Sequence, residues 1–336
     1  MTPRMIHASV ESPDALQSVI QRSDALAVRG LLALERRGIG YLDAGYPLHL
    51  RGPSGCGKTT LALRIAAALK RPILLLVGDA RFDTGSLVGA DEVTRTRQVA
   101  DRYISSVINV GGQTDTVWLD RALTLACAEG ATLVYDEFTR SPAQANTVLL
   151  TVLEERLLVL PQGNQGGSQG ESYAPVHPAF RAIFTSNPVD PVAFHEAQDA
   201  LIDRMITIDL DGFDRETEVE IAANRSGLPL IEAACIVDIV RDFRASREYA
   251  QRPTLRASVM IARLVAAQGP RVAASDPRFL QVCLDVLASK LKPDADGLPD
   301  PRQRDLLVRL IDHFSGSPSG TRPLDTRPLD TRQAAA

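Results

Sequence analysis

The chain has 336 residues, of which 45% are hydrophobic, with a formal net charge of −4 and a pI near 5.8. This length accommodates two domains, and the apolar content is enough for a sizeable core. The acidic balance excludes a global attraction to nucleic acid or to an anionic membrane surface, so we expect neither as a partner.

Four cysteines, Cys56, Cys127, Cys235 and Cys283, lie far apart, with no C-x-x-C pair. Their spacing argues against a disulfide framework or a zinc ribbon and is typical of a reducing compartment. The N-terminal residues are polar and acidic where a signal peptide needs an apolar segment, and no apolar run reaches the roughly 20 residues of a membrane helix. We therefore expect a soluble cytoplasmic protein without a membrane partner.

The elements expected in chain order lead into a glycine-rich turn. Residues 1–25 form a polar lead-in, and apolar spacing predicts a helix over 27–43. A short strand is expected at 46–50 and a strong helix at 58–69. Residues 73–77 are a continuous apolar run of the kind found in buried parallel strands.

Further strands are expected at 131–135, 182–185 and 206–210, with a helix at 142–158. Strands that alternate with helices predict an α/β core, a parallel sheet covered by helices, over residues 26–212. From Asp214 the strand-like runs stop. Five helices then predict a small all-α lid over residues 213–314, at 214–225, 229–247, 254–268, 276–291 and 302–314.

Residues 315–336 contain TRPLD twice in tandem and are dominated by Pro, Gly, Ser and charged residues. Such a composition predicts a disordered tail, and two copies of five residues are too few for a repeat fold.

Residues 52–59 match the pattern G-x-x-x-x-G-K-[ST] at every fixed position, between an expected strand and an expected helix. Glycines let backbone N–H groups fold around phosphate oxygens, and the helix N-terminus adds its positive dipole end. Lys58 would contact the β- and γ-phosphates, and the Thr59 hydroxyl would ligate Mg²⁺. An ordinary glycine-rich turn is the alternative. The predicted ATP-binding residues are Gly52, Pro53, Ser54, Gly55, Cys56, Gly57, Lys58, Thr59 and Thr60.

Asp136 and Glu137 end an apolar run at the edge where α/β sheets bind ligands. One carboxylate suffices for the ion, so we expect Asp136 to orient Mg²⁺ and Glu137 to polarise the attacking water. A strand that ends in solvated charges is the alternative, and the upstream phosphate loop favours the catalytic interpretation. The expected reaction is hydrolysis of ATP to ADP and phosphate.

Three further polar residues are candidates for sensing the nucleotide. Asn187 would bind the γ-phosphate or the attacking water, if its strand lies beside that of Asp136; a turn Asn before Pro is the alternative. Arg204 would reach the ATP of a neighbouring subunit, or instead form a surface pair with an aspartate. Arg256 opens an expected helix of the all-α part, and Arg252 competes with it for the role.

In this order, the phosphate loop, the acidic pair, Asn187, Arg204 and Arg256 resemble an AAA+ ATPase of the MoxR-like branch. Several segments resemble the gas vesicle protein N family more closely, namely RGPSGCGKTTLAL, GDARFDTGSLVGAD, LVYDEFTRSPAQANTVLLTVLEE, VHPAFRAIFTSNP and DALIDRMITIDL. The resemblance covers roughly residues 40–270. It implies an αβα core with a helical lid and a homo-oligomeric ring, expected to be a hexamer, with sites between subunits.

The resemblance also implies a minor assembly factor in gas vesicle formation, located at the vesicle, with shell or accessory proteins as partners. By the motif match, residues 52–59 carry over as ATP-binding, Asp136 as linked to Mg²⁺ and Glu137 as the catalytic carboxylate. Asn187 carries over as first sensor, Arg204 as arginine finger and Arg256 as second sensor. Cys56 departs from many relatives, which should be harmless.

Two segments and three rival functions stay open. Residues 86–120, with Arg95, Arg97, Arg102 and Trp118, form either a loop presented to a client protein or a helical excursion. Residues 156–180 are expected to form a hairpin, either facing a central pore or without consequence. The rival functions are a MoxR-type chaperone that activates a metalloenzyme, a nucleotide-gated scaffold and a nucleic-acid motor, and the acidic balance disfavours the last.

Overall fold

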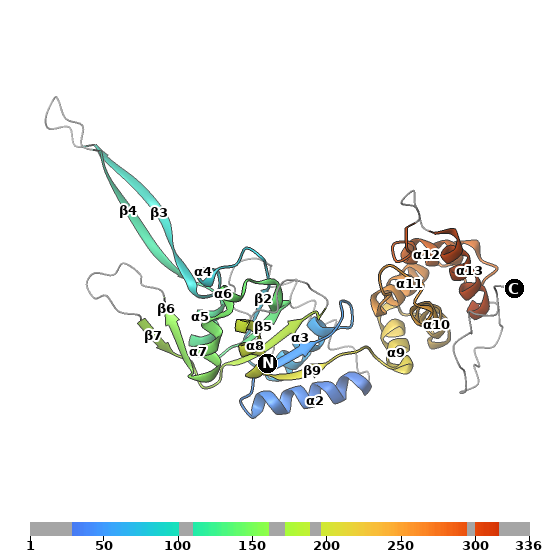
Figure 1. The fold of residues 1–336 in the computed structure, drawn as a ribbon, viewed down its shortest axis with the longest axis horizontal. Helices are drawn as coiled ribbons and strands as arrows, with labels where there is room; N and C mark the ends of the chain where they lie inside the picture. The colour runs from blue at the N-terminus through green and yellow to red at the C-terminus, as the bar shows by residue number, and fades with distance from the viewer. Residues whose placement is uncertain (1–28, 101–109, 161–171, 189–195, 294–299, 316–336) are drawn as a thin grey trace. The chain divides into compact units, whose positions relative to one another are not determined.

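A computed structural model describes residues 29–100, 110–160, 172–188, 196–293 and 300–315 (Figure 1). The chain divides into two compact units. Among the described residues, the first unit holds Glu35–Arg51 and Thr59–Asp209. The second holds residues 29–34, Gly52–Lys58 and the chain from Leu210 onward.

The first unit is built on a five-stranded parallel sheet in the order β2-β5-β8-β1-β9. The predicted α/β fold is confirmed, and so is the expectation that the strand before Asn187 lies beside the strand of Asp136. The apolar side chains of the five strands are largely buried, as expected for parallel strands covered on both faces. The strands are β1 (Leu48–Arg51), β2 (Ile73–Val77), β5 (Thr132–Asp136), β8 (Arg181–Ser186) and β9 (Ile206–Asp209).

Helices precede the first of these strands and lie between the later ones. The helix expected over 142–158 is wrong in extent, because the helical path breaks at Thr147 and ends at Glu154, after which Arg156 adopts a left-handed backbone with φ 57°. The helices are α2 (Arg29–Asp43), α3 (Lys58–Ala68), α4 (Thr84–Val88), α5 (Ala122–Glu129), η1 (Phe138–Arg140), α6 (Ala143–Asn146), α7 (Val148–Glu154) and α8 (Glu196–Asp203).

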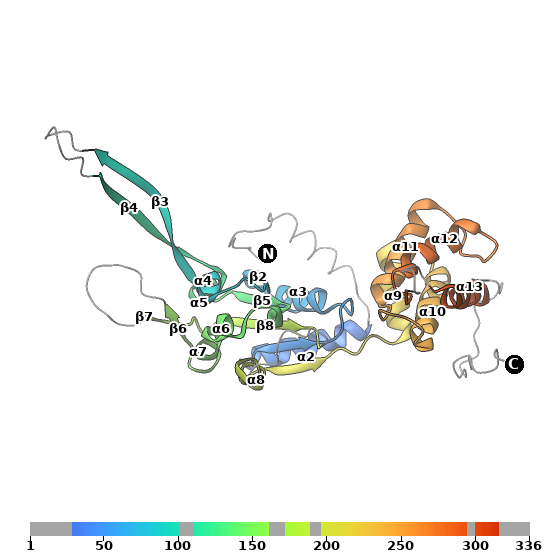
Figure 2. The ribbon, with the colours of Figure 1, turned by 45° about the horizontal axis from the view of Figure 1, so that its top comes forward.

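Within the segment 86–120, the described residues 89–100 and 110–120 form an antiparallel ribbon, so the alternative of a helical excursion is wrong. β3 (Gly89–Ala100) pairs with β4 (Val110–Asp120), with one irregularity between Val93 and Arg95 (Figure 2). Thr and Val are frequent in both strands and favour extended backbone. Arg102 lies outside the described residues.

A second ribbon confirms the strands of the expected hairpin at 156–180. β6 (Leu157–Leu160) pairs antiparallel with β7 (Ser172–Pro175). Residues 161–171, the expected tip, lie outside the described part of the chain.

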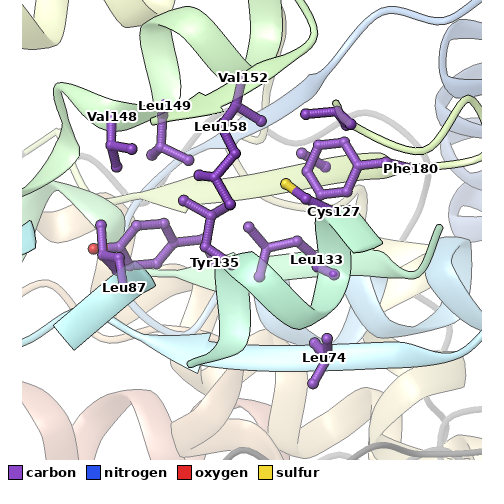
Figure 3. Close-up of a cluster of buried hydrophobic side chains, with 14 of the residues drawn as sticks. Leu74, Leu87, Cys127, Leu133, Tyr135, Val148, Leu149, Val152, Leu158 and Phe180 are labelled. Atoms are coloured by element: carbon purple, nitrogen blue, oxygen red, sulfur yellow. The ribbon is translucent and has the colours of Figure 1, made fainter. Parts of the chain in front are cut away.

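In the core of the first unit, helices and strand β6 pack against one face of the sheet. Figure 3 shows Leu133 and Tyr135 of β5 among Leu149 of α7, Leu158 of β6 and Phe180, all at most 1% exposed. Burying side chains of this size contributes about 1.5–3 kcal/mol each. This packing fixes β5 against its neighbours and so positions the residues at its end.

In the second unit, the regular elements that the structure describes from Arg215 onward are helices, as predicted. Asp214 and Asp276 cap helix N-termini with their carboxylates, while Gly227 and Gly269 end helices in left-handed conformations. The helices are α9 (Arg215–Ser226), α10 (Leu230–Ser246), α11 (Leu255–Gln268), α12 (Pro277–Ala288) and α13 (Pro301–Ser315). Within the described ranges, no helix has the length and apolar character needed to span a membrane.

His49 is a fully buried polar residue in the sheet. Its Nε2 lies 2.8 Å from the Ser186 hydroxyl on β8, and its Nδ1 lies 3.0 Å from the Thr207 hydroxyl on β9. Burial, and then the charge of Arg51, lower the pKa of His49 from 6.5 to about 4. The ring is therefore neutral at pH 7 and links three strands.

His49 should make the free energy of unfolding depend on pH. Because its pKa is lower in the folded than in the unfolded chain, its stabilisation is complete above pH 6.5 and is lost as the pH falls toward 4, by about 3 kcal/mol. We expect His49→Gln to remove this component of the pH dependence in urea unfolding. His177→Gln, at an exposed position, should retain it. An unchanged decline in the His49 variant would contradict the buried neutral ring.

Candidate active site

The Asp136 carboxylate, at the carboxyl end of β5, accepts hydrogen bonds from two threonines. The Thr59 hydroxyl lies 2.8 and 2.9 Å from its two oxygens, and the Thr185 hydroxyl lies 2.6 Å from Oδ1. The register that pairs Tyr135 with Phe184 makes Asp136 level with Thr185. Three side chains from separate segments thus converge at one end of the sheet.

The sequence motifs do not single out Thr185. Its Oγ1 donates to Asp136 and also accepts from the backbone N–H of Glu137 at 2.9 Å. One hydroxyl therefore fixes both acidic residues. The sequence shows only a threonine near the end of an expected strand, and its role becomes visible once β8 is known to lie beside β5.

Glu137 has a left-handed backbone, with φ 52° and ψ 41°. For a non-glycine residue this costs about 1–3 kcal/mol, so the surroundings must enforce it. Gly78, the residue after β2, is another residue that the motifs miss. A Cβ there would lie 2.2 Å from the Glu137 carbonyl oxygen, and the Gly78 N–H donates to the Asp136 carbonyl at 2.8 Å. The missing side chain lets the acidic pair lie against the end of β2.

A buried polar network holds the turn that follows Glu137. The Tyr135 hydroxyl lies 2.7 Å from Ser141 Oγ and 3.0 Å from Asn146 Oδ1, and Asn146 Nδ2 donates to the Phe138 carbonyl at 3.2 Å. Burial raises the pKa of Tyr135 to about 12, which keeps its hydroxyl protonated. These bonds satisfy polar groups that would otherwise be costly to bury.

The Glu137 carboxylate is itself engaged. Its Oε2 lies 2.6 Å from Nη1 of Arg140, three residues along the chain, and both side chains are partly exposed. Pairs of this exposure are weak, so the carboxylate can exchange this partner for another at little cost.

The phosphate loop belongs to the second unit, where Lys58 is 6% exposed. Its Nζ donates to the carbonyl oxygens of Gly52 and Pro53, at 2.9 Å each, across the mouth of the loop. Gly55 and Gly57 have φ values of 80° and 91°, which disfavour any side chain. The two carbonyl contacts hold the Lys58 ammonium group inside the loop, where it would attract a bound phosphate.

A small hollow in the second unit lies beside the loop and is lined by Ser54, Phe213 and Arg252, among others. A Cβ on Gly55 would lie 2.5 Å from the Thr254 hydroxyl and 3.6 Å from Cβ of Arg256. Both arginines proposed as second sensor therefore lie next to the phosphate loop. Cys56 is 5% exposed, and burial raises the pKa of its thiol.

The remaining candidates lie in the first unit. Asn187 is half-buried directly after β8. Arg204 follows α8, and its guanidinium lies 2.5 and 2.7 Å from Glu154 Oε2 and donates to the Ala200 carbonyl. The alternative of a surface pair with an aspartate is therefore corrected, because the carboxylate that pairs with Arg204 is that of Glu154, on α7.

The oxygen donors of Thr59 and Asp136 suit Mg²⁺, which is usually held by one or two protein oxygens, several waters and substrate phosphates. Within the described ranges, no group of three His, Cys, Asp or Glu residues forms a larger metal cluster. The fit of Mg²⁺ thus rests on a hydroxyl and a carboxylate already in contact.

Comparison with known proteins gives consistent similarities. The family model "AAA domain (dynein-related subfamily)" matches residues 47–205. The gas vesicle ATPase GvpN of Ancylobacter aquaticus is 46% identical over 304 residues, covering 90% of this chain and 84% of that protein. GvpN of Haloferax mediterranei is 42% identical, covering 76% and 72% of the respective chains. GvpN2 of Halobacterium salinarum is 40% identical, covering 80% and 76%.

The close approach at Gly78 predicts a specific cost. Gly78→Ala should lower the free energy of unfolding by about 1–3 kcal/mol, because backbone must move away from the new Cβ. Gly40→Ala, in α2 with open space around the position, should instead raise it by about 0.5–1 kcal/mol. Chemical denaturation measures both. Equal effects of the two substitutions would show that residue 78 has room for a side chain.

Proposed function

The chain belongs to the gas vesicle ATPase GvpN family, and from this membership we propose that its hydrolysis of ATP to ADP and phosphate drives a step in gas vesicle formation. The observation that carries the proposal is the Asp136 carboxylate, joined by hydrogen bonds to Thr59 and Thr185 at the end of the sheet. This is where a magnesium nucleotide needs oxygen ligands.

In the proposed site, the backbone N–H groups of residues 52–60 bind the phosphates, and Lys58 exchanges its two carbonyl partners for phosphate oxygens. Thr59 and Asp136 hold Mg²⁺, which when bound neutralises charge on the phosphates. The direct bond between these two residues in the structure keeps both oxygens within reach of one ion.

Glu137 polarises the attacking water as general base. Thr185 and Gly78 set its backbone, and its carboxylate leaves Arg140 when water and γ-phosphate are in place. Asn187 acts as first sensor by bonding to the γ-phosphate or to the water.

We propose that Arg204 acts in trans, on the nucleotide of a neighbouring subunit in a ring. From the family, we expect this ring to be a hexamer. Such an arginine offsets charge that develops in the transition state. Before a neighbour docks, the guanidinium bonds to Glu154 and to the Ala200 carbonyl, partners that it can exchange at little cost. Arg256, next to the phosphate loop, acts as second sensor, with Arg252 as its competitor.

The proposed partners are gas vesicle shell or accessory proteins, and the proposed location is at the vesicle. Identity of 40–46% to gas vesicle ATPases over most of the chain favours this role over a MoxR-type chaperone. A nucleotide-gated scaffold differs in one respect, because it would not need Glu137.

Glu137→Gln should keep ATP affinity within about twofold while lowering the turnover number by about 10²–10⁴, since the amide cannot accept the proton of water. Fluorescent-ATP titration and phosphate release measure the two quantities. Glu129→Gln, an exposed position at the end of α5, is the control and should match the parent.

The same variant tests the biological role. In gas-vesicle-forming cells that lack their own gas vesicle ATPase, the parent chain should restore pressure-collapsible vesicles, whereas Glu137→Gln should not. Restoration by both chains would favour a scaffold, and restoration by neither would count against the gas vesicle role.

Arg204→Ala should leave ATP binding intact and lower turnover by about 10³-fold or more, as expected for a lost arginine finger. Arg278→Ala, which removes an exposed cation from α12, serves as control. If Arg204 acts in trans, mixing Arg204→Ala with Glu137→Gln subunits should recover part of the parent rate, because some interfaces then combine an intact Glu137 with an intact Arg204. No recovery at any mixing ratio would argue against shared sites.

A further inference from the structure

Three arginines of the first unit converge on one short loop. Arg71 precedes β2, Arg156 precedes β6 and Arg181 opens β8, and all three side chains are half-buried. Each donates hydrogen bonds to carbonyl oxygens of the loop 177–180, which connects β7 with β8. We call Arg71, Arg156 and Arg181 the arginine cluster.

The contacts place the charges close together. The Pro178 carbonyl oxygen accepts from Arg156 Nη2 at 3.2 Å and from Arg181 Nη1 at 2.9 Å, so these nitrogens lie within about 6 Å of each other. Arg71 donates to the next carbonyl, that of Ala179. Since the Debye length is about 8 Å at physiological ionic strength, the guanidinium groups repel one another.

The arginine cluster has no carboxylate partner among the described residues, whereas other arginines of this unit do. Arg51 pairs with Asp209, Arg64 with Glu35 and Arg204 with Glu154. The carbonyl partners of the cluster are neutral.

The pKa of Arg181 reflects its burial and the positive charges around it. Burial lowers the pKa of Arg181, and the charges of Arg71 and Arg156 lower it further, against a weaker opposing effect of Asp43. An anion bound here would relieve this repulsion.

The loop that receives these bonds is fixed before any ligand binds. The backbone N–H of His177 donates to Cys127 of α5 at 2.8 Å, and that of Arg181 donates to Ala131 at 3.2 Å. His177 Nδ1 accepts from the Ala179 N–H at 3.0 Å. Arg156 also lies over the Phe180 ring, 5.8 Å from its centroid. Guanidinium groups held in this way lose little further freedom on binding.

The arginine cluster lies at the opposite edge of the sheet from the proposed nucleotide site. Ile73, Thr132 and Arg181 are in register at the amino ends of three adjacent strands, whereas Asp136 ends β5. The length of β5 separates the two edges by about 13 Å. The unpaired charge is thus distinct from the phosphate-binding machinery.

We propose that the arginine cluster is a docking surface for a carboxylate-bearing segment of a partner protein. Planar guanidinium groups match carboxylates through paired N–H···O bonds. Three arginines around one loop suit a short acidic segment, whereas nucleic acid needs an extended basic surface, and the chain as a whole carries a net charge of −4. The proposal does not depend on the proposed nucleotide chemistry.

A fluorescein-labelled oligoglutamate peptide tests the proposal on the full chain by fluorescence anisotropy without nucleotide. The parent should bind it more tightly than an oligolysine peptide, and added salt should weaken the binding. The Arg71→Gln/Arg156→Gln double variant should lose about tenfold or more in affinity. The Arg278→Gln/Arg309→Gln double variant removes the same charge from exposed positions of the second unit and should bind like the parent.

Hydrogen exchange of the parent with and without peptide keeps the test independent of whether a variant folds. Protection should appear at Arg156 and in residues 177–181. Protection confined to other segments would overturn the proposal, as would equal losses in the two double variants. Tighter binding of single-stranded DNA of equal charge, abolished by Arg71→Gln/Arg156→Gln, would reassign the surface to nucleic acid.

Discussion

The arrangement of the candidate active site depends on one carboxylate, that of Asp136. It accepts hydrogen bonds from Thr59 and Thr185, which lie 77 and 49 positions away in the sequence. Hydrogen bonds to an ionised acceptor are short and strong, so this contact constrains all three segments. It forms only because β8 lies directly against β5, and the buried cluster of Leu133, Tyr135 and their neighbours maintains that order.

Consecutive residues of β8 serve opposite faces of the sheet. Thr185 bonds to Asp136 on one face, while Ser186 meets the buried, neutral His49 on the other. If β8 shifted by one residue relative to its neighbours, each of its side chains would move to the other face of the sheet. Both contacts would then break, and Phe184 would leave the face on which it is buried. The His49 contact thus stabilises the register on which the Asp136 contact depends, although it lies outside the motifs.

The sequence predicts what is local. Lys58 and Thr59 fall within one loop and the first turn of a helix, and Asp136 ends an apolar strand, so spacing alone assigns them. Thr185 and Gly78 escape such reasoning because their roles are contacts between strands whose order no local pattern encodes.

Other differences have similar causes. The sequence left the state of the segment that holds β3 and β4 open, because its weakly apolar residues carry no decisive periodicity, and strand pairing decides against a helix. The partner of Arg204 is Glu154, fifty positions away, and a nearby aspartate in the sequence gives no hint of it. Ser141 and Asn146 look like ordinary turn and helix residues until Tyr135 is seen to bond to both.

The two edges of the sheet differ chemically because, in a parallel sheet, all strands end at one edge and begin at the other. At the carboxyl edge, side chains of Asp136 and Thr185 face the start of a helix; at the amino edge, the loop 177–180 turns its carbonyl oxygens toward three arginines. β8 connects both edges, but it is a short, buried strand paired on both sides, and this packing opposes a second arrangement. Coupling between sites requires an element with two states that each ligand biases differently. An acidic segment at the arginine cluster should therefore tether a partner without altering the affinity of one subunit for nucleotide, and any effect of such a partner on turnover would have to arise from contacts elsewhere.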